Sequence, residues 1–271
     1  MSGPELAAET CARRLAPLGI STLPAAGDGP AGSDQEVGIA VDGKRQAGLE
    51  LWLSWYGPAG PTREQDGSEA VLQAVTGLMQ VHGRDAGMPR RLGLEAASVA
   101  AGILAAQGVL AALVGRSRGR PTSAVRTSVL QAALVLVSHS VAAATTGDEW
   151  VPAPPAPAPG PPFATADGHW LEMETLDPEA WKRFWQRLGA GDADLGWAWT
   201  LFRSRYYRGT CTLPPGLHEA TASHSLAAIT RVADDCDVSL CPLRSYQDVL
   251  DDPGRWEGHA AVRLLAGAAV T

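Results

Sequence analysis

The sequence is poor in cysteine and has no leader-like beginning. Its 271 residues include four cysteines, Cys11, Cys211, Cys236 and Cys241, and no two of them have CxxC spacing. The opening residues MSGPELAAETCARRLAPLGI lack the basic segment and apolar run of a secretory signal. We therefore expect a reduced, cytoplasmic protein, with Cys236 and Cys241 as core or strand residues rather than a redox pair.

Positive charge is also in short supply. Lys and Arg number 22 against 29 Asp and Glu, which gives a formal net charge of −7. Non-specific affinity for nucleic acid depends on many Lys and Arg residues, so the negative net charge argues against a nucleic-acid partner. Basic sites, if present, are expected to be local. The sequence also lacks the GxxxxGK[ST] phosphate-binding loop and any internal repeat.

Strongly apolar runs of membrane-spanning character are missing as well. Residues 96–115 are long enough to cross a bilayer, but they consist mainly of Ala and Gly with a Gln inside, and such residues contribute little to membrane insertion. We expect this run and residues 132–144 to form buried core helices, with no membrane partner. The hydrophobic content of 45% is sufficient for a real core.

Strand and helix signals alternate in the first part of the chain. They predict a buried strand, an amphipathic helix with Ser68 as its N-cap, a helix of small residues, a basic turn, and a short strand that runs into a long, mostly buried helix. In chain order these elements are expected over residues 48–57, 67–83, 92–113, 115–121 and 122–144. This alternation predicts an α/β large domain over residues 1–150.

A proline-rich segment, residues 151–162, is expected to be a semi-rigid linker that ends the large domain. A smaller α+β domain is expected over residues 163–271. Its predicted elements are a β-hairpin with its turn at Asp167–Gly168, a helix capped by Asp177, a second amphipathic helix over residues 217–237, and a short extended segment followed by a helix capped by Ser245. Its core is expected to hold the tryptophans Trp181, Trp185, Trp197 and Trp199.

Five segments, taken in this order, resemble the family III CoA-transferases, which include formyl-CoA transferase, carnitine CoA-transferase and alpha-methylacyl-CoA racemase. The segments are SWYGPAGPTREQDGSEAVLQAVTGLM, AASVAAGILAAQGVLAAL, TSVLQAALVL, PFATADGHWLEMETLDPEAWKRFW and DVSLCPLRSYQDVLDDP. They lie between about Leu49 and Pro253. Relative to the family, we expect a shortened amino-terminal segment, with fewer of the basic residues that contact the nucleotide.

The resemblance has consequences for fold and ligands. It implies an incomplete Rossmann-like large domain, with the smaller α+β domain after the proline-rich linker. It also implies CoA or an acyl-CoA thioester as a substrate, no permanently bound cofactor, and a homodimer or hetero-oligomer.

Ser98 stands where the family usually has an aspartate, at the start of the small-residue helix. In the transferases that carboxylate is understood to form acyl and CoA intermediates, which requires an ionisable carboxylate nucleophile. A serine hydroxyl needs an adjacent base, and EAASVAA offers none at close range. Glu95, three residues earlier, is expected to cap the helix rather than to assist Ser98.

The racemases of the family pair the same aspartate with a histidine before an earlier helix. The matching position is Ser68, which is followed by Glu69. A serine hydroxyl cannot remove an α-proton unaided, so racemisation by the family's mechanism is not expected.

The remaining candidates are basic residues and histidines. Arg90, Arg91 and Arg118 are candidates for contact with CoA phosphates, with a solvated basic surface as the alternative. His82 is expected to cap the end of a helix, and His139 to be a satisfied core residue. No His or Cys pair has metal-ligand spacing, so no metal is expected.

Three hypotheses of function remain open. The chain is an acyl-CoA transferase-like enzyme with altered chemistry, a catalytically silent partner of a complete enzyme, or a tailoring protein that binds a small molecule other than CoA in the same cleft.

Overall fold

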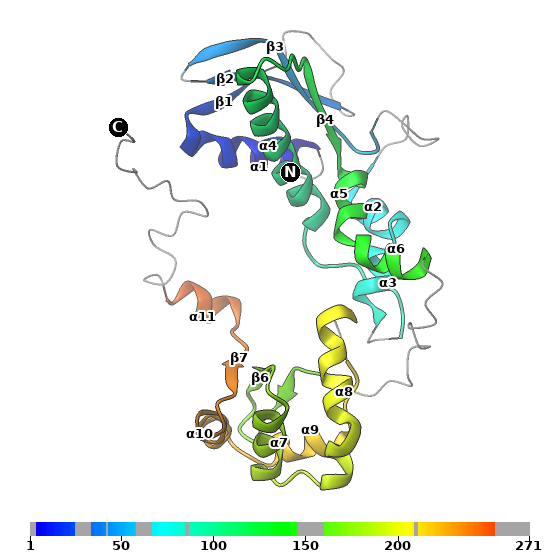
Figure 1. The fold of residues 1–271 in the computed structure, drawn as a ribbon, viewed down its shortest axis with the longest axis vertical. Coiled ribbons are helices and arrows are strands. Elements are labelled where there is room, and N and C mark those ends of the chain that lie inside the picture. The colour runs from blue at the N-terminus through cyan, green and yellow to red at the C-terminus, as the bar shows by residue number, and fades with distance from the viewer. Residues whose placement is uncertain are drawn as a thin grey trace. The chain divides into compact units, whose positions relative to one another are not determined.

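The computed structural model describes residues 4–24, 34–41, 43–57, 67–84, 87–145, 160–208 and 211–252. The chain divides into two compact units, Met1–Val151 and Pro152–Thr271 (Figure 1). The division falls at the start of the proline-rich segment. Most of that segment, residues 151–159, lies outside the described residues.

Unit 1 combines helices with a four-stranded sheet. Its elements are α1 (Pro4–Leu15), η1 (Ala16–Leu18), β1 (Ile20–Pro24), β2 (Asp34–Val41), β3 (Lys44–Ser54), α2 (Glu69–Val75), α3 (Leu78–His82), α4 (Ala96–Ser117), β4 (Ala124–Ser128), α5 (Val129–Leu136) and α6 (Ser138–Thr145). The α/β class is confirmed. The predicted strand over residues 48–57 is the second half of β3, while α1, β1 and β2 were not predicted.

The sheet of unit 1 has the order β1-β2-β3-β4. β1 pairs with β2 and β2 with β3 in antiparallel fashion, whereas β3 and β4 are parallel, in register from Glu50 opposite Ala124 to Ser54 opposite Ser128. A parallel pair requires a crossover connection, and α2, α3 and α4 supply it. The sheet is therefore mixed, and its Rossmann-like part is the single parallel pair among the described strands.

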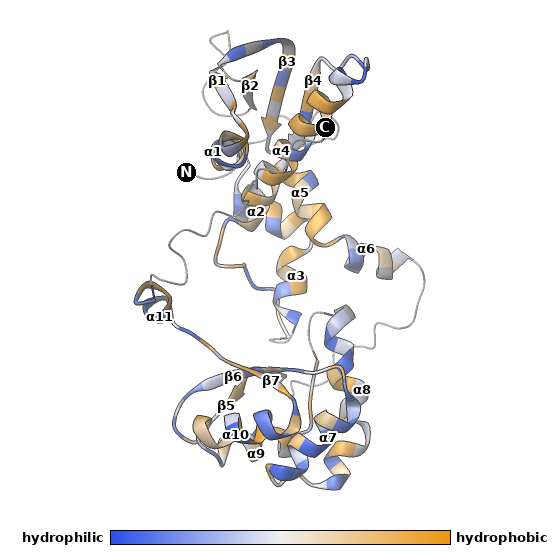
Figure 2. Ribbon diagram, turned by 60° about the vertical axis from the view of Figure 1, so that its left-hand side comes forward, coloured by the Kyte–Doolittle hydropathy of each residue, from blue (hydrophilic) through white to orange (hydrophobic). Residues whose placement is uncertain are grey.

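The small residues of α4 allow close contact with α1 and β4. A Cβ atom added at Gly102 would lie 2.5 Å from the Ala7 carbonyl oxygen, and one at Gly108 would lie 2.6 Å from Val125 Cγ1. Figure 2 shows α4 as a largely apolar helix between α1 and β4. Length and composition alone would let α4 span a membrane. Its packing explains the same composition, because α4 is a core helix of unit 1.

Two predicted helices of unit 1 are each broken in two. α2 ends at Thr76, whose hydroxyl donates to the Leu72 carbonyl (2.7 Å), and Gly77 takes a left-handed φ of 79° before α3. The helix after β4 is interrupted at Val137, the C-cap of α5. His139 on α6 is exposed, so its expected place in the core is wrong.

Unit 2 contains a three-stranded antiparallel sheet of order β5-β6-β7. Its elements are β5 (Phe163–Ala164), β6 (Trp170–Glu174), α7 (Pro178–Arg187), α8 (Asp192–Arg208), α9 (Pro215–Ala222), α10 (Leu226–Cys236), β7 (Ser239–Pro242) and α11 (Tyr246–Leu250). The predicted hairpin and the caps at Asp177 and Ser245 are confirmed. α8 was not predicted as a helix.

The second amphipathic helix of unit 2 is also two helices. α9 ends before Ser223, and Ser225 caps α10 by accepting from the Ala228 amide. The hairpin turn is attached at this break, because the Thr165 hydroxyl and the Leu226 amide both donate to Asp167. These hydrogen bonds hold the pKa of Asp167 below its ordinary value.

Tryptophans form much of the unit 2 core, as expected, with one exception. Trp181 and Trp185 are buried and pack edge to face, with ring centroids 6.0 Å apart. Trp199 is half-buried and packs on Trp181, while Trp197 is 58% exposed. The expected core position of Trp197 is therefore wrong.

Candidate functional site

Ser98, in the first turn of α4, is bound to a carboxylate from another helix. Glu69, the first residue of α2, accepts from the Ser98 hydroxyl (2.6 Å) and the Ser98 amide (3.0 Å) through Oε2. Its Oε1 accepts from the Ala97 amide (2.9 Å) and from Gln73 Nε2 (3.1 Å). The amides at the start of a helix have no partner within the helix, so Glu69 acts as the cap of α4 from 29 residues away in sequence.

This carboxylate and hydroxyl are closed off from solvent. Ser98 has no exposed surface, and Glu69 is 2% exposed. A carboxylate has about four lone-pair sites, and the four donors occupy them. The positive end of the α4 dipole adds to the stabilisation of the charge. The hydrogen bonds between Glu69 and the first turn of α4 fix α4 against α2, and the buried side chains of this pair are not accessible to a ligand.

Gln73 extends the network to the loop that enters α4. Its Nε2 donates to the Leu94 carbonyl (3.1 Å), and its Oε1 accepts from the Leu92 amide (2.9 Å). Gln73 is fully buried one turn after Glu69. The two side chains therefore fix both the loop and the first turn of α4, and with them the position of Ser98.

Glu95 does not cap α4, which corrects the expectation from sequence. It occupies the N-cap position, but its side chain makes no cap hydrogen bond. Its carboxylate lies 3.3 Å from Arg91 Nη2 in a partly exposed ion pair. Ser68 does act as predicted, because its hydroxyl accepts from the Val71 amide (3.2 Å) and caps α2.

Glu69 was predicted as a site residue only through its neighbour Ser68, and its capping role was missed. A signal for this role is present in the sequence. Glu69, Gln73 and Thr76 repeat at i, i+4 and i+7 on the face of α2 that also buries Leu72. Polar residues that share the buried face of a helix need partners, so the pattern indicates a polar network beneath α2.

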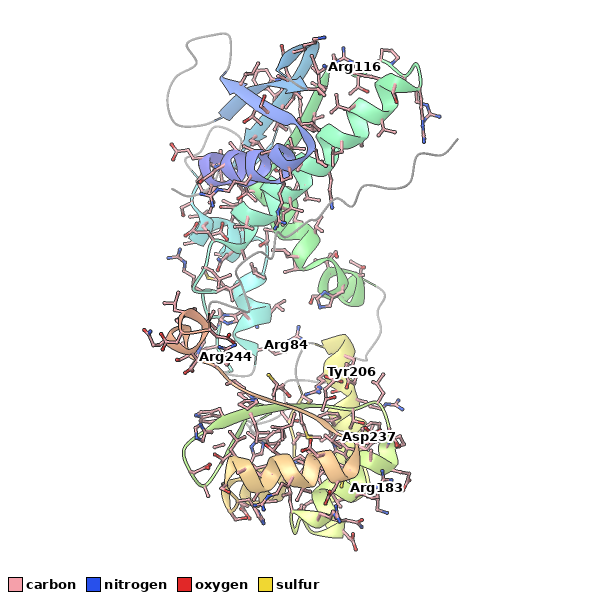
Figure 3. All side chains as sticks on the ribbon, turned by 90° about the vertical axis from the view of Figure 1, so that its left-hand side faces the viewer. Arg84, Arg116, Arg183, Tyr206, Asp237 and Arg244 are labelled. Carbon is pink, nitrogen blue, oxygen red and sulfur yellow. The ribbon has the colours of Figure 1, made fainter. Side chains whose placement is uncertain are left out.

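The three candidate arginines do not converge. Arg90 and Arg91 are exposed and precede α4, whereas Arg118 is exposed and follows it. The 22 residues of α4 span about 33 Å at 1.5 Å per residue. Figure 3 shows Arg116, two residues before Arg118, at the end of α4 beside the sheet. One phosphate group therefore cannot be bound by all three side chains.

Other titratable residues are engaged in local structure. His82 ends α3, and its Nδ1 is 3.1 Å from the Arg90 carbonyl oxygen. Arg205 and Tyr206 of α8 reach the carboxylates of β6, with Arg205 Nη1 2.6 Å from Glu172. Within the described residues, no group of three or more His, Cys, Asp and Glu side chains is placed to hold a metal ion.

The carboxyl ends of β3 and β4 form the edge of the sheet where ligands of open α/β sheets usually bind. The Ser54 hydroxyl accepts from the Gly57 amide (2.9 Å), and Gly57 has a left-handed φ of 88°. Ser128 caps α5 by accepting from the Gln131 amide (3.1 Å). Sequence analysis did not select these residues. Their hydrogen bonds hold the turn after β3 and the start of α5, and they are separate from the closed Glu69–Ser98 pair.

Comparison with protein families gives one match over most of the chain. The model described as CoA-transferase family III matches residues 51–266. The probable fatty acyl-CoA transferase Rv3272 of Mycobacterium tuberculosis is 25% identical over 256 residues, which are 88% of this chain and 64% of the relative. Human succinyl-CoA:glutarate CoA-transferase is 28% identical over 121 residues, 43% of this chain and 28% of the relative.

Solved structures agree in fold. A crystal structure of Rv3272 from M. tuberculosis superposes with a TM-score of 0.60 at 23% identity, and covers 81% of this chain and 63% of its own. A CAIB/BAIF family protein from Brucella suis gives 0.52 at 17% identity, with coverages of 76% and 55%. The chain thus spans less than two thirds of the length of these relatives.

Proposed function

Because the chain belongs to CoA-transferase family III, we propose that it is a catalytically silent homologue of the acyl-CoA transferases, one that does not form a covalent intermediate at residue 98. Its role is then that of a partner or regulator of acyl-CoA chemistry. The observation that carries the proposal is the Ser98 hydroxyl, which is fully buried and bonded to Glu69 at 2.6 Å.

The chemistry of acyl transfer explains why this observation matters. In the carboxylate route, a carboxylate oxygen attacks the thioester carbonyl, CoA leaves as the thiolate, and a mixed anhydride remains that the thiolate can attack again. An acyl ester on serine is far less activated than an anhydride. The Ser98 hydroxyl must also lose its proton before it can attack efficiently.

A competing hypothesis is that Glu69 serves as the base for Ser98. The distance is suitable for proton transfer. Two features favour a capping role instead. Glu69 already accepts four hydrogen bonds, including two from α4 amides, and a carboxylate is a weak base toward an alcohol. Neither side chain has surface that a thioester carbonyl can reach.

Weak CoA binding is the second part of the proposal. Arg91 is paired with Glu95, and Arg118 lies at the opposite end of α4 from Arg90 and Arg91. The three candidate arginines, Arg90, Arg91 and Arg118, therefore form no cluster for the CoA phosphates. Titration calorimetry with CoA is expected to give a Kd above about 100 μM, which corresponds to a binding free energy weaker than about 5.5 kcal/mol.

The direct test is a transfer assay. The protein is incubated with succinyl-CoA or a fatty acyl-CoA and with free glutarate as acceptor, and new acyl-CoA is followed by mass spectrometry. Human succinyl-CoA:glutarate CoA-transferase serves as the positive control with succinyl-CoA. We expect no product from this chain. Turnover that is lost in Ser98→Ala would refute the proposal and identify an acyl-serine enzyme with Glu69 as its base.

The Ser98→Asp variant separates loss of the nucleophile from closure of the site. We expect it to remain inactive, because the new carboxylate would be buried against Glu69 Oε2 and the two acidic side chains could not both keep the present hydrogen bonds. Activity gained by this variant would show that the pocket for an acyl thioester is intact.

A further inference from the structure

One stretch of unit 1 is positively charged, although the chain as a whole is acidic. Residues 96–147 contain four arginines and no Asp or Glu, whereas the whole chain has 29 acidic residues. Three of these arginines are exposed, two in the turn after α4 and one in β4. We define the basic strip by these three residues: Arg118, Arg120 and Arg126.

The side chains of the basic strip are not needed to close the end of α4. The Gly115 carbonyl near that end accepts from the backbone amides of Arg118 (3.1 Å) and Arg120 (2.9 Å). The helix dipole favours positive charge only around the last turn, where Arg116 already lies. Capping and the dipole therefore do not explain the side chains of Arg120 and Arg126.

Acidic neighbours do not neutralise the basic strip within the part of the chain that the structure describes. Glu50 of β3 lies opposite Ala124, but it forms no ion pair with Arg126. The Arg126 guanidinium instead lies over the Trp52 ring, 5.7 Å from the ring centroid. Other arginines do form ion pairs with carboxylates, namely Arg13, Arg91, Arg187, Arg205 and Arg244. The basic strip thus leaves its guanidinium groups available to carboxylates of another molecule.

β4 also offers an edge to a further strand. It comes last in the order β1-β2-β3-β4, so among the described strands it has a neighbour on one side only (Figure 1). The Glu50 amide of β3 donates to the Ser123 carbonyl (3.1 Å), and the backbone groups of successive residues in a parallel strand point to alternate sides. The amides and carbonyls of Ala124 and Arg126 therefore point away from β3. Such an edge can pair with an extended segment of another chain.

We propose that the basic strip and the edge of β4 bind an extended, acidic segment of another protein. The backbone of that segment pairs with Ala124 and Arg126, and its carboxylates pair with the guanidinium groups of the basic strip. Charge complementarity favours this partner over a basic or apolar segment, and strand pairing favours it over a compact anion. This inference does not depend on the proposed function.

The test measures fluorescence anisotropy of labelled peptides of about ten residues at neutral pH. A Glu-Val repeat is acidic and can form a strand, the same repeat with N-methylated amides keeps the charge but donates no backbone hydrogen bond, and a Lys-Val repeat reverses the charge. The protein variant carries Arg118→Glu and Arg120→Glu together. Arg203→Glu is the matched control, because Arg203 is an exposed arginine of α8 that forms no ion pair with a described residue. Circular dichroism confirms that both proteins are folded.

We expect the Glu-Val repeat to bind the wild type and the Arg203→Glu control equally, and to bind the double variant at least about tenfold more weakly. Binding should also weaken with added salt, and about fivefold or more on N-methylation, while the Lys-Val repeat should not bind. No saturable binding of the Glu-Val repeat at about 500 μM wild-type protein would overturn the inference. So would equal binding of this repeat by the double variant, equal binding of the N-methylated repeat, or tighter binding of a short oligothymidylate, which would make the partner a nucleic acid.

Discussion

Replacing Glu69 with alanine should destabilise unit 1 far more than removal of a glutamate normally does. The carboxylate accepts from the amides of Ala97 and Ser98, from the Ser98 hydroxyl and from Gln73. Glu69→Ala leaves both amides without their acceptor in a buried position. Gln73 keeps its bonds to the loop before α4.

The expected loss follows from these contacts. A buried amide without a partner costs about 1–3 kcal/mol, and loss of a helix cap costs about 0.5–2 kcal/mol. The unpaired-amide cost and the lost-cap cost describe the same two amides, so they are not added in full. Water that enters the space left by the Glu69 side chain can bind these amides and recovers part of the lost stability. We therefore expect Glu69→Ala to lower the free energy of unfolding by about 2–4 kcal/mol, or the melting temperature by about 6–12 °C.

Glu95→Ala is the matched control, because it removes a glutamate at the same helix end. Glu95 makes a partly exposed ion pair with Arg91 and no cap hydrogen bond, so its loss should cost less than about 1 kcal/mol. Thermal unfolding followed by circular dichroism compares the two variants. Equal losses, or a loss below about 1 kcal/mol for Glu69→Ala, would refute the assignment of the cap to Glu69.

Three further predictions concern packing, reactivity and pH. Gly102→Ala should destabilise unit 1 by about 1–3 kcal/mol in urea unfolding, because its Cβ would lie 2.5 Å from a carbonyl oxygen of α1. Gly115→Ala on the same helix meets no atom closer than 3.9 Å and should stabilise by up to about 1 kcal/mol. Burial raises the pKa of Cys11 to about 12, so a thiol reagent at pH 8 should modify exposed Cys241 and leave Cys11 unmodified until the protein is denatured. The pKa of Asp167 is lower in the folded state, so its stabilisation is present above the unfolded pKa of about 3.9 and is lost as pH falls through the folded pKa. Asp167→Asn should therefore weaken the loss of stability in acid, measured by urea unfolding below pH 5.

Sequence predicted best those features that are encoded within a few residues. The caps at Ser68, Asp177 and Ser245 formed as expected, because each needs one side-chain oxygen and an amide two or three residues ahead. The hairpin turn at Gly168 formed for a similar reason, with a left-handed φ of 83°. Such interactions depend little on the rest of the fold.

Helix breaks were missed because hydrophobic periodicity continues across them. Gly77 separates α2 from α3 although apolar residues recur on both sides, and Val137 separates α5 from α6 in the same way. At the second break no Gly or Pro marks the change, so packing determines where the helix ends. The break between α9 and α10 was missed for the same reason, although Ser225, a residue type that favours helix N-caps, lies at the start of α10 and indicates a new helix there.

The connection between Glu69 and Ser98 could not be read from local spacing. The residues are 29 positions apart, and their contact arises where α2 packs on the first turn of α4. Sequence analysis therefore assigned the cap to Glu95, which is nearer in the chain. It identified Ser98 through resemblance to a family, but the acceptor of its hydroxyl required the structure.

The central claim, that residue 98 forms no covalent intermediate, is tested most directly by intact-mass and peptide-mapping spectrometry after incubation with a fatty acyl-CoA. The account predicts that the wild type and Ser98→Ala keep the same unmodified mass, because the Ser98 hydroxyl is buried and bonded to Glu69. An acyl adduct on the wild-type peptide that contains Ser98, absent from Ser98→Ala, would contradict it.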